Sequence, residues 1–166
     1  YEEFAIRKAL VIAPKRVAED TWSREQAKWE HLKHLKVVKV MGTKDNRLAA
    51  LKEQADIYII NRENVEWLVE TLGTRWRFDA VVIDELSSFK SAKSKRWKAL
   101  RKVIFGSRYV YGLTGTPASN GYLDLWPEMY LLDHGERLGK TLGAYRSTYF
   151  NPGAHKGHVV FEWRLK

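Results

Sequence analysis

Two short peptides, Val81-Val82-Ile83-Asp84-Glu85 and Tyr111-Gly112-Leu113-Thr114-Gly115-Thr116-Pro117, decide the fold of this chain. The first is an apolar run that stops at two acids, which is typical of a buried parallel strand whose carboxyl end faces a ligand site. The second is a strand-like run followed by a tight turn with two hydroxyl groups and little side-chain bulk. Both peptides predict strands of an α/β sheet whose carboxyl ends flank a binding site.

Apolar runs and helical stretches alternate along the rest of the chain, and this alternation predicts an α/β fold with a mainly parallel sheet and helices on both faces. The predicted strands are Ala9 to Ala13, Val37 to Met41, Asp56 to Ile60, Ala80 to Asp84 and Tyr109 to Leu113, and the predicted helices include Val17 to Leu32, Lys44 to Gln54 and Asn64 to Leu72. A loop around Asn151-Pro152-Gly153 and one more strand from His158 to Leu165 are expected at the C-terminal end.

Asp84 and Glu85 form a pair of acids suited to nucleotide chemistry. One carboxylate, assigned to Asp84, can hold Mg²⁺ through its water shell, and the next, Glu85, can orient an attacking water. The alternative is a strand that merely ends in two solvated acids. For the second peptide the alternative is an ordinary strand-to-helix connection, in which Thr116 or Ser119 caps a helix that begins near Tyr122.

The ordered set of peptides resembles superfamily two helicases. Asp84-Glu85 and the Thr114 to Pro117 turn resemble their motifs II and III, Ala13-Pro14 resembles motif Ia, and Asn61 to Asn64 stands where motif Ib belongs. Within that superfamily the likeness is to Swi/Snf-type DNA translocases of the phage-encoded kind, because Trp22 and Trp29 flank the helix after motif Ia and Lys90 follows motif II. The resemblance runs from about Ala9 to Phe150.

This resemblance implies a RecA-like fold of the P-loop NTPase class. Residues 1–150 would be a first helicase lobe that is incomplete at its N-terminus, and residues 151–166 a loop and edge strand leading toward a missing second lobe. The parent protein would use ATP and Mg²⁺ to move on DNA, whereas this chain alone would bind neither and be nearly inactive. The implied roles are catalysis for Asp84 and Glu85, coupling for Ser87, Thr114, Gly115 and Thr116, and sequence-independent DNA backbone contact for Pro14, Lys15, Arg16, Asn61 and Arg62.

Two features depart from the family pattern. Ser87 stands where the family usually has His, and its hydroxyl can bond Thr114 or Thr116 but cannot carry charge. The chain also contains no Gly-x-x-x-x-Gly-Lys-Ser/Thr phosphate loop; the segment Gly135 to Thr141 has one residue too few between its glycines and follows a predicted helix instead of a strand. We interpret Gly139 to Phe150 as a helix that packs Leu142, Tyr145 and Tyr149 inward.

The net charge of +9 and the isoelectric point near 9.7 indicate a polyanionic partner. Residues 86–117 hold eight Lys or Arg and no acid, and six of them fall on one predicted helix whose buried stripe would be Trp97, Leu100 and Ile104. The alternative for this helix is a solvated charged face.

The chain has no Cys, so disulfides and thiolate metal sites are excluded, and no apolar run is long enough for a membrane span. A cytoplasmic protein with no membrane partner is therefore expected. Two other functions remain open: a non-catalytic basic DNA-binding domain, and a Mg²⁺-dependent nuclease that uses Asp84 and Glu85 with Asp79 or Asp124.

Overall fold

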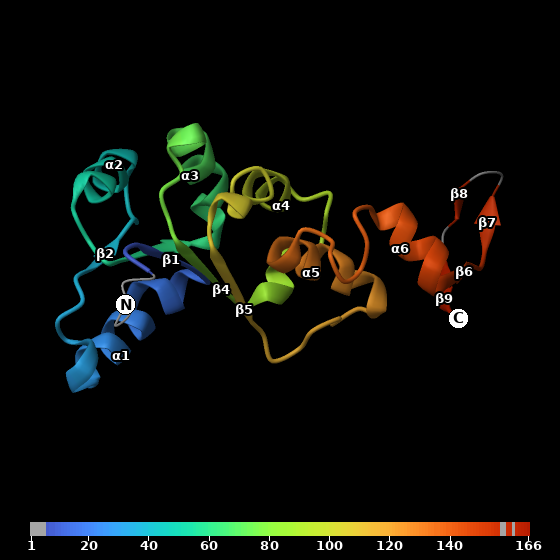
Figure 1. Cartoon of the computed structure of the whole chain (residues 1–166), viewed down its shortest axis with the longest axis horizontal. Coiled ribbons are helices and arrows are strands. Elements are labelled where there is room, and N and C mark those ends of the chain that lie inside the picture. The colour runs from blue at the N-terminus through green and yellow to red at the C-terminus, as the bar shows by residue number, and fades with distance from the viewer. Residues whose placement is uncertain (1–5, 157–158, 161) are drawn as a thin grey trace.

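A computed structural model describes residues 6–156, 159–160 and 162–166, and its centre is a five-stranded parallel sheet (Figure 1). The strands are β1 (Ala9–Ala13), β2 (Val37–Lys39), β3 (Ile57–Asn61), β4 (Ala80–Asp84) and β5 (Tyr109–Leu113). Their order in the sheet is β2-β3-β1-β4-β5, with β1 in the middle. All four neighbouring pairs run parallel, as predicted.

Helices cover both faces of this sheet. Figure 1 shows α2 (Lys44–Lys52), α3 (Val65–Leu72) and α4 (Lys95–Leu100) along one side and α1 (Trp22–Lys28) on the other. Helices α5 (Leu125–Asp133) and α6 (Leu142–Tyr149) follow β5. Short 3-10 helices are formed by Glu30–Leu32, Arg62–Asn64, Gly73–Arg75, Leu86–Phe89, Ile104–Gly106 and Tyr122–Asp124, and a π-helical turn by Val17–Thr21. The predicted fold class is confirmed.

The core has two parts, one on each face of the sheet. The larger part joins the strands to α2, α3, α4, α5 and α6, and it includes Trp97, Leu100 and Ile104, each at most 1% exposed, as the helical spacing predicted. The smaller part packs Val11, Ala13 and Ile59 against Ala18 of the π-helical turn. Every residue of β1 is buried, which is expected for a central strand covered on both faces.

The helical stretch predicted from Val17 to Leu32 is present but is not one continuous α-helix. The segment is a π-helical turn, then α1, and then a break at Trp29, whose backbone is extended (φ −94°, ψ 120°). The side-chain amide of Gln26 donates to the carbonyls of Leu32 and Leu35 at 2.7 and 3.1 Å and fixes the turn that follows. These contacts reach beyond one helical turn, so helical periodicity does not reveal them.

The C-terminal segment forms two small antiparallel sheets instead of a single added strand. One pairs β6 (Phe150–Pro152) with β9 (Trp163–Leu165), and the other pairs β7 (His155–Lys156) with β8 (Val159–Val160). The predicted strand from His158 to Leu165 is therefore divided, and His158 lies outside the described residues. In α6, Tyr145 is buried as predicted, but Tyr149 is 42% exposed, so its inward packing is wrong.

Gly112 in β5 is required by close packing. A Cβ at this position would lie 2.5 Å from Cδ2 of Leu86 and 3.3 Å from Cδ2 of Leu132. Leu86 is itself buried, so it has little space into which to move. This contact joins β5 to the short helix that follows Glu85.

We predict that Gly112→Ala lowers the free energy of unfolding by about 1–3 kcal/mol, because the added methyl group overpacks the contact with Leu86. Gly115→Ala is the matched control, since nothing lies within 4 Å of a Cβ at Gly115 and it should change stability by less than about 0.5 kcal/mol. Urea unfolding followed by circular dichroism measures both. Equal stability of the two variants would contradict the packing argument.

Candidate functional site

The two signature peptides meet at the carboxyl edge of the sheet. Strands β4 and β5 are parallel neighbours, with Asp84 opposite Leu113. The chain therefore places Glu85 beside Thr114, because each is the residue that follows this pair. Asp84, Glu85 and Thr114 are all half-buried, whereas Gly115 and Thr116 are exposed. The structure thus brings together the predicted catalytic and coupling residues.

Glu85 is the centre of this arrangement. Its Oε1 accepts a hydrogen bond from the Ser87 hydroxyl at 2.5 Å and a longer one from the Thr114 hydroxyl at 3.4 Å. The Thr114 hydroxyl in turn accepts from the backbone N–H of Thr116 at 3.2 Å. The sequence suggested a direct hydrogen bond from Ser87 to Thr114 or Thr116. In the structure, Ser87 and Thr114 instead donate to the same oxygen of the Glu85 carboxylate.

The backbone of Glu85 is in the left-handed region, with φ 60° and ψ 61°. A non-glycine residue adopts this conformation at a cost, and such residues are concentrated at functional sites. The conformation ends β4 sharply and starts the 3-10 helix Leu86–Phe89, which carries Ser87 back toward the Glu85 carboxylate.

Asp84 has a partner that sequence reasoning missed. The indole Nε1 of Trp22, at the start of α1, donates to Oδ2 of Asp84 at 2.9 Å. An aromatic residue 62 positions away gives no local signal of this bond. The contact orients one oxygen of the carboxylate and leaves the other for a ligand.

Lys90 connects the 3-10 helix after Glu85 to the loop after β5. Its Nζ donates to the hydroxyl of Ser119 at 2.8 Å and lies 3.9 Å from Oδ2 of Asp124. The alternative that Thr116 or Ser119 caps the next helix is wrong, since neither Tyr122–Asp124 nor α5 has a side-chain cap. Ser119 is instead held by Lys90.

Glu128 in α5 was also missed, because it lies within an apolar helical pattern. It is 1% exposed, and its Oε1 has no hydrogen-bond partner within the described residues. Burial, together with the nearby Asp124 and Glu85 carboxylates, raises the pKa of the Glu128 carboxyl to about 7, although Lys90 opposes the shift. A buried acid with a pKa near neutrality therefore lies next to the Glu85 site.

A nuclease-type cluster of acids is not formed. The Asp79 carboxylate accepts from the backbone N–H groups of Arg7 and Lys8 at 2.9 Å. Asp79 precedes β4 whereas Asp84 ends it, so about 16 Å of extended chain separates them. No group of three or more His, Cys, Asp or Glu in the described segments is placed to hold a metal ion. Asp84 and Glu85 alone suit Mg²⁺, which keeps most of its waters and takes only one or two carboxylates.

A groove of about 690 Å³ lies at the ends of β1, β2 and β3. It is lined by Lys15, Glu19, Lys39, Met41, Gly42, Asn61, Glu63 and Asn64. Lys15 and Arg16 are exposed, Pro14 is half-buried, and Lys15 Nζ lies 3.9 Å from Glu19. Of the predicted DNA-contacting residues, the structure thus brings Lys15 and Asn61 to one groove.

Asn61 itself is only 7% exposed. Its amide donates to Glu63 at 2.8 Å and its carbonyl accepts from Asn64 at 2.6 Å, while Asn64 accepts from Arg47 of α2. Burial acts to raise the pKa of the Glu63 carboxyl, but hydrogen bonds from Asn61, its own backbone and Arg62 lower it below the usual value. Asn61 therefore orders the loop after β3.

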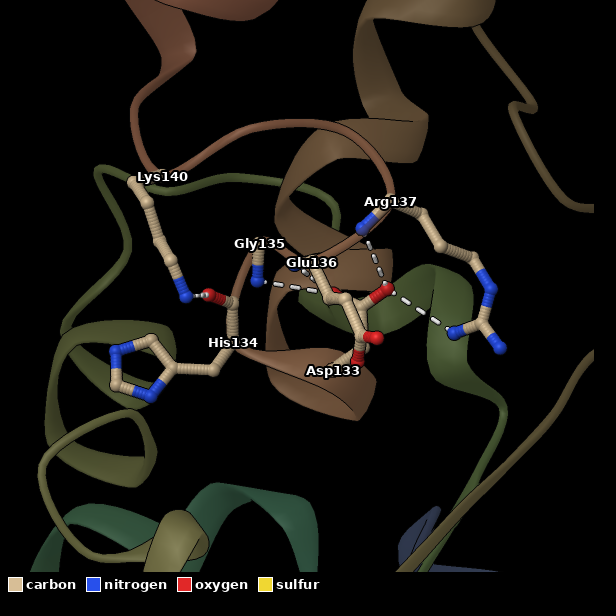
Figure 2. Close-up of polar contacts among 6 residues, drawn as sticks. All are labelled: Asp133, His134, Gly135, Glu136, Arg137 and Lys140. Atoms are coloured by element: carbon tan, nitrogen blue, oxygen red, sulfur yellow. Dashed lines mark hydrogen bonds and ion pairs between the residues drawn. The ribbon is translucent and has the colours of Figure 1, made fainter.

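The segment from Gly135 to Thr141 follows the end of α5, and its first backbone amides donate to the carboxylate of Asp133 (Figure 2). The Asp133 carboxylate, at the end of α5, accepts from the backbone N–H groups of Gly135, Glu136 and Arg137 at 2.9 to 3.2 Å. Arg137 Nη1 also donates to Asp133 at 3.1 Å. The amides that a phosphate would need are therefore already occupied.

Lys140 is engaged as well, since its Nζ donates to the carbonyl of His134 at 2.8 Å (Figure 2). Gly135 has φ 74°, and a Cβ there would lie 2.5 Å from the carbonyl oxygen of Gly139. These glycines close a tight turn. The geometry agrees with the prediction that this segment is not a nucleotide loop.

Comparisons with known proteins agree with this geometry. The sequence profile of the family described as SNF2-related domain matches residues 2–141. The chain is 44% identical over 148 residues to "Putative protein p41" of Acyrthosiphon pisum secondary endosymbiont phage 1. The matched region covers 85% of this chain and 32% of that protein. It is 30% identical over 129 residues to "Helicase ssl-1" of Caenorhabditis elegans, covering 74% of this chain and 5% of the relative.

A solved structure is also similar. The Sulfolobus solfataricus SWI2/SNF2 ATPase core in complex with dsDNA superposes with a TM-score of 0.72 at 28% identity, over 89% of this chain and 29% of that one. The chain thus spans about a third or less of the length of these relatives. No described helix is long and apolar enough to cross a membrane.

We predict that the contribution of Glu128 to stability falls as the pH rises from about 4.5 to 7. The folded pKa of Glu128, about 7, lies above the ordinary value of 4.5. The folded chain therefore holds a proton that the unfolded chain has lost, so stability present below pH 4.5 is lost as the pH rises through 7. The shift corresponds to at most about 3 kcal/mol.

Glu128→Gln removes this titration, so its free energy of unfolding should change less between pH 5 and pH 8 than that of the parent chain. Urea unfolding at both pH values measures the difference. Glu136→Gln, at an exposed acid, is the control and should keep the parental pH dependence. A Glu128→Gln profile parallel to that of the parent would contradict the raised pKa.

We also predict that Asn61→Ala lowers the free energy of unfolding by about 1–3 kcal/mol, because it removes two part-buried hydrogen bonds and leaves the Asn64 side-chain N–H without its acceptor. Asn120→Ala, at an exposed amide, should change stability by less than about 0.5 kcal/mol. Thermal and urea unfolding measure both. A silent Asn61→Ala would show that the loop after β3 is ordered by other contacts.

Proposed function

The chain belongs to the SNF2-related domain family, and from this premise we propose that it is the first motor lobe of an ATP-dependent DNA translocase. Residues 1–150 form the lobe, and residues 151–166 lead toward a second lobe in a longer parent protein. The observation that carries the proposal is the Glu85 carboxylate, held at the carboxyl edge of a parallel sheet by Ser87 and by Thr114 of the neighbouring strand's turn. The family match, the similarity to a helicase and the similarity to a solved SWI2/SNF2 ATPase core also support this proposal.

In the proposed mechanism the two acids have separate tasks. Asp84 would hold Mg²⁺ through its water shell, with Trp22 orienting one of the carboxylate oxygens. Glu85 positions the water that attacks the terminal phosphate and can take up its proton. Bound Mg·ATP supplies the phosphoryl group and the charge neutralisation. The donor set supports this assignment, because two adjacent carboxylates at a strand end are sufficient for an ion that keeps its own waters.

Coupling follows from the shared hydrogen bonds. If the Glu85 carboxylate moves, its hydrogen bonds with Ser87 and with Thr114 both change. Thr114 is linked through the N–H of Thr116 to the exposed turn that includes Gly115. The nucleotide state can therefore be passed from the acids to the loop after β5.

The phosphate loop is proposed to come from a segment outside residues 1–166, because none of these residues forms one. The relatives are at least three times longer than the matched region. Within the described residues β5 is an edge strand, and its Tyr111 and Leu113 side chains are 49% and 45% exposed on the face that also carries Asp84. This uncovered apolar face suits a further strand and helix, so this chain alone is expected to bind ATP poorly.

DNA is proposed to lie along the groove at the ends of β1, β2 and β3. Lys15 and Arg16 contact phosphates, and Pro14 sets the direction of the chain at the start of the helical turn. Asn61 positions the loop that presents Arg62. The similar Sulfolobus core was solved with double-stranded DNA, which supports this partner. Contacts to the DNA backbone alone do not select a base sequence. A phage-encoded motor of this kind would work in the cytoplasm of its host.

The test uses the complete reading frame that contains this sequence. We predict that Asp84→Asn and Glu85→Gln each lower DNA-stimulated ATP hydrolysis by about 100-fold or more, the effect of removing a group that acts in the transition state. Duplex DNA binding should change by less than about twofold, since neither acid faces the proposed DNA groove. Phosphate release and fluorescence anisotropy measure the two activities.

Glu136→Gln is the matched control and should keep parental hydrolysis, because Glu136 lies on the exposed turn after α5. Salt-sensitive DNA binding with no ATP hydrolysis in the unmodified protein would favour the non-catalytic DNA-binding domain. Hydrolysis by the 166-residue chain at the rate of the complete protein would refute the need for an external phosphate loop.

A further inference from the structure

Helix α4 carries a stripe of positive charge that the proposed mechanism does not use. Lys95, Lys98, Arg101 and Lys102 are all exposed, and we call these four residues the α4 stripe. Their spacing of three, six and seven residues places them on one side of the helix and its following turn. Trp97 and Leu100 are buried against the core, and Arg101 lies at the edge of the stripe, beside Trp97.

The described part of the chain supplies no counter-ion to the α4 stripe. Among the described residues, none of its four side chains has an acidic group within 4.0 Å or a hydrogen bond to a protein atom. The helix packed against it, α3, carries Glu66 and Glu70, and neither forms an ion pair with the stripe. Residues 86–117 contain no acid, so the sequence nearby cannot neutralise it.

Three exposed lysines on and after α1 are neutralised locally. Lys28 lies 3.7 Å from Glu25, Lys33 forms a 2.5 Å contact with Glu30, and Lys36 lies 3.2 Å from Glu53. The contrast matters because an exposed cation with a partner acid contributes little field, whereas four uncompensated cations on one face add together. Single exposed cations without a printed partner also occur elsewhere, at Lys44 and Lys52, and α4 differs in placing four of them together.

One cation of the stripe is partly ordered in advance. The guanidinium of Arg101 lies over the rings of Trp97 and Tyr130, at 5.2 and 5.5 Å from their centroids. Such stacking restricts the side chain while leaving its N–H donors available. Less conformational freedom is then lost when an anion binds.

The dimensions match the backbone of a duplex. Lys102 follows Lys95 by seven positions along α4 and its following turn, so the stripe is about 10 Å long at a helical rise of about 1.5 Å per residue. Phosphates follow one another every 3.4 Å along the axis on each strand of B-DNA, so about three of them lie alongside the stripe. The stripe itself consists of cations, and its exposed apolar neighbour Phe105 is stacked on His134, which suits phosphate contact better than recognition of a peptide.

We propose that the α4 stripe is a second DNA-contacting surface, which binds the phosphate backbone of a duplex. None of its residues lines the groove that holds Lys15 and Asn61. In Figure 1, α3 lies between α4 and the α2 side of the sheet, where that groove is formed. The stripe deepens the proposed function by giving its DNA partner a separate site, and it rests on that function only for the identity of the polyanion.

The test compares two triple variants that remove the same charge from the 166-residue chain. Lys95→Ala, Lys98→Ala and Lys102→Ala together remove most of the stripe, and Lys28→Ala, Lys33→Ala and Lys36→Ala together remove three paired lysines. Binding of a fluorescein-labelled 20-base-pair duplex of mixed sequence is measured by anisotropy between about 50 and 200 mM salt. Circular dichroism and thermal unfolding verify that each variant is folded.

We expect the stripe variant to bind at least about tenfold more weakly at low salt, and the slope of log affinity against log salt to fall by about 2 to 3. The control variant should lose less than about twofold. Equal losses in both variants would mean that net charge alone acts, and an unchanged stripe variant would mean that α4 does not touch DNA. Either result overturns the proposal.

Two further arms separate the alternatives. If the stripe variant keeps its DNA affinity but loses binding to poly-glutamate, the surface takes an acidic protein segment and the DNA proposal is wrong. A Lys15→Ala, Arg16→Ala variant tests the groove independently. Loss of affinity in the stripe variant with none in the groove variant supports the stripe and rejects the proposed track, whereas the reverse result rejects the stripe alone.

Discussion

The register between β4 and β5 is the constraint on which the site depends. Because Asp84 pairs with Leu113, the residues that follow them lie side by side. The Glu85 carboxylate therefore accepts a hydrogen bond from the Thr114 hydroxyl. Gly112 fits this arrangement closely, since a Cβ there would lie 2.5 Å from Leu86 and would force a shift in the packing. Packing two residues away from the acids thus decides whether a strand end becomes a site. A shift of one residue would turn Thr114 to the other face of the sheet.

Charge is distributed unevenly around this pair of strands. Near the acids, Lys90 is the cation that touches Asp124 and Ser119, and Glu128 is buried with an unpaired oxygen. On α4 the reverse holds, because its cations face solvent without acids. A buried carboxyl is tolerated when it is neutral, and a cationic face is tolerated when it is solvated. The buried Glu128 carboxyl and the cations of α4 thus lie in opposite environments, one inside the core and one in solvent.

Strand positions were largely predictable from the sequence. The bounds of β1, β4 and β5 agree with the prediction, because each is an apolar run ended by a polar residue or a turn. The break at Trp29 was not predictable, since Gln26 holds it through carbonyls up to nine residues away. The carboxylates of Asp84 and Glu85 could be named, but the Trp22 bond and the burial of Glu128 depend on tertiary contacts.

The replacement of the usual His by Ser87 changes how this site can respond. An imidazole would gain or lose a proton near neutral pH, whereas the Ser87 hydroxyl only donates, and it does so to the oxygen that Thr114 also uses. Two donors on one oxygen hold Glu85 in a single orientation as long as the carboxylate is ionised. A pKa near neutrality, which an imidazole would have had, is found instead at Glu128. Burial and its acidic neighbours raise the pKa of this carboxyl to about 7. Proton-linked behaviour of this lobe should therefore be sought in α5 instead of at position 87.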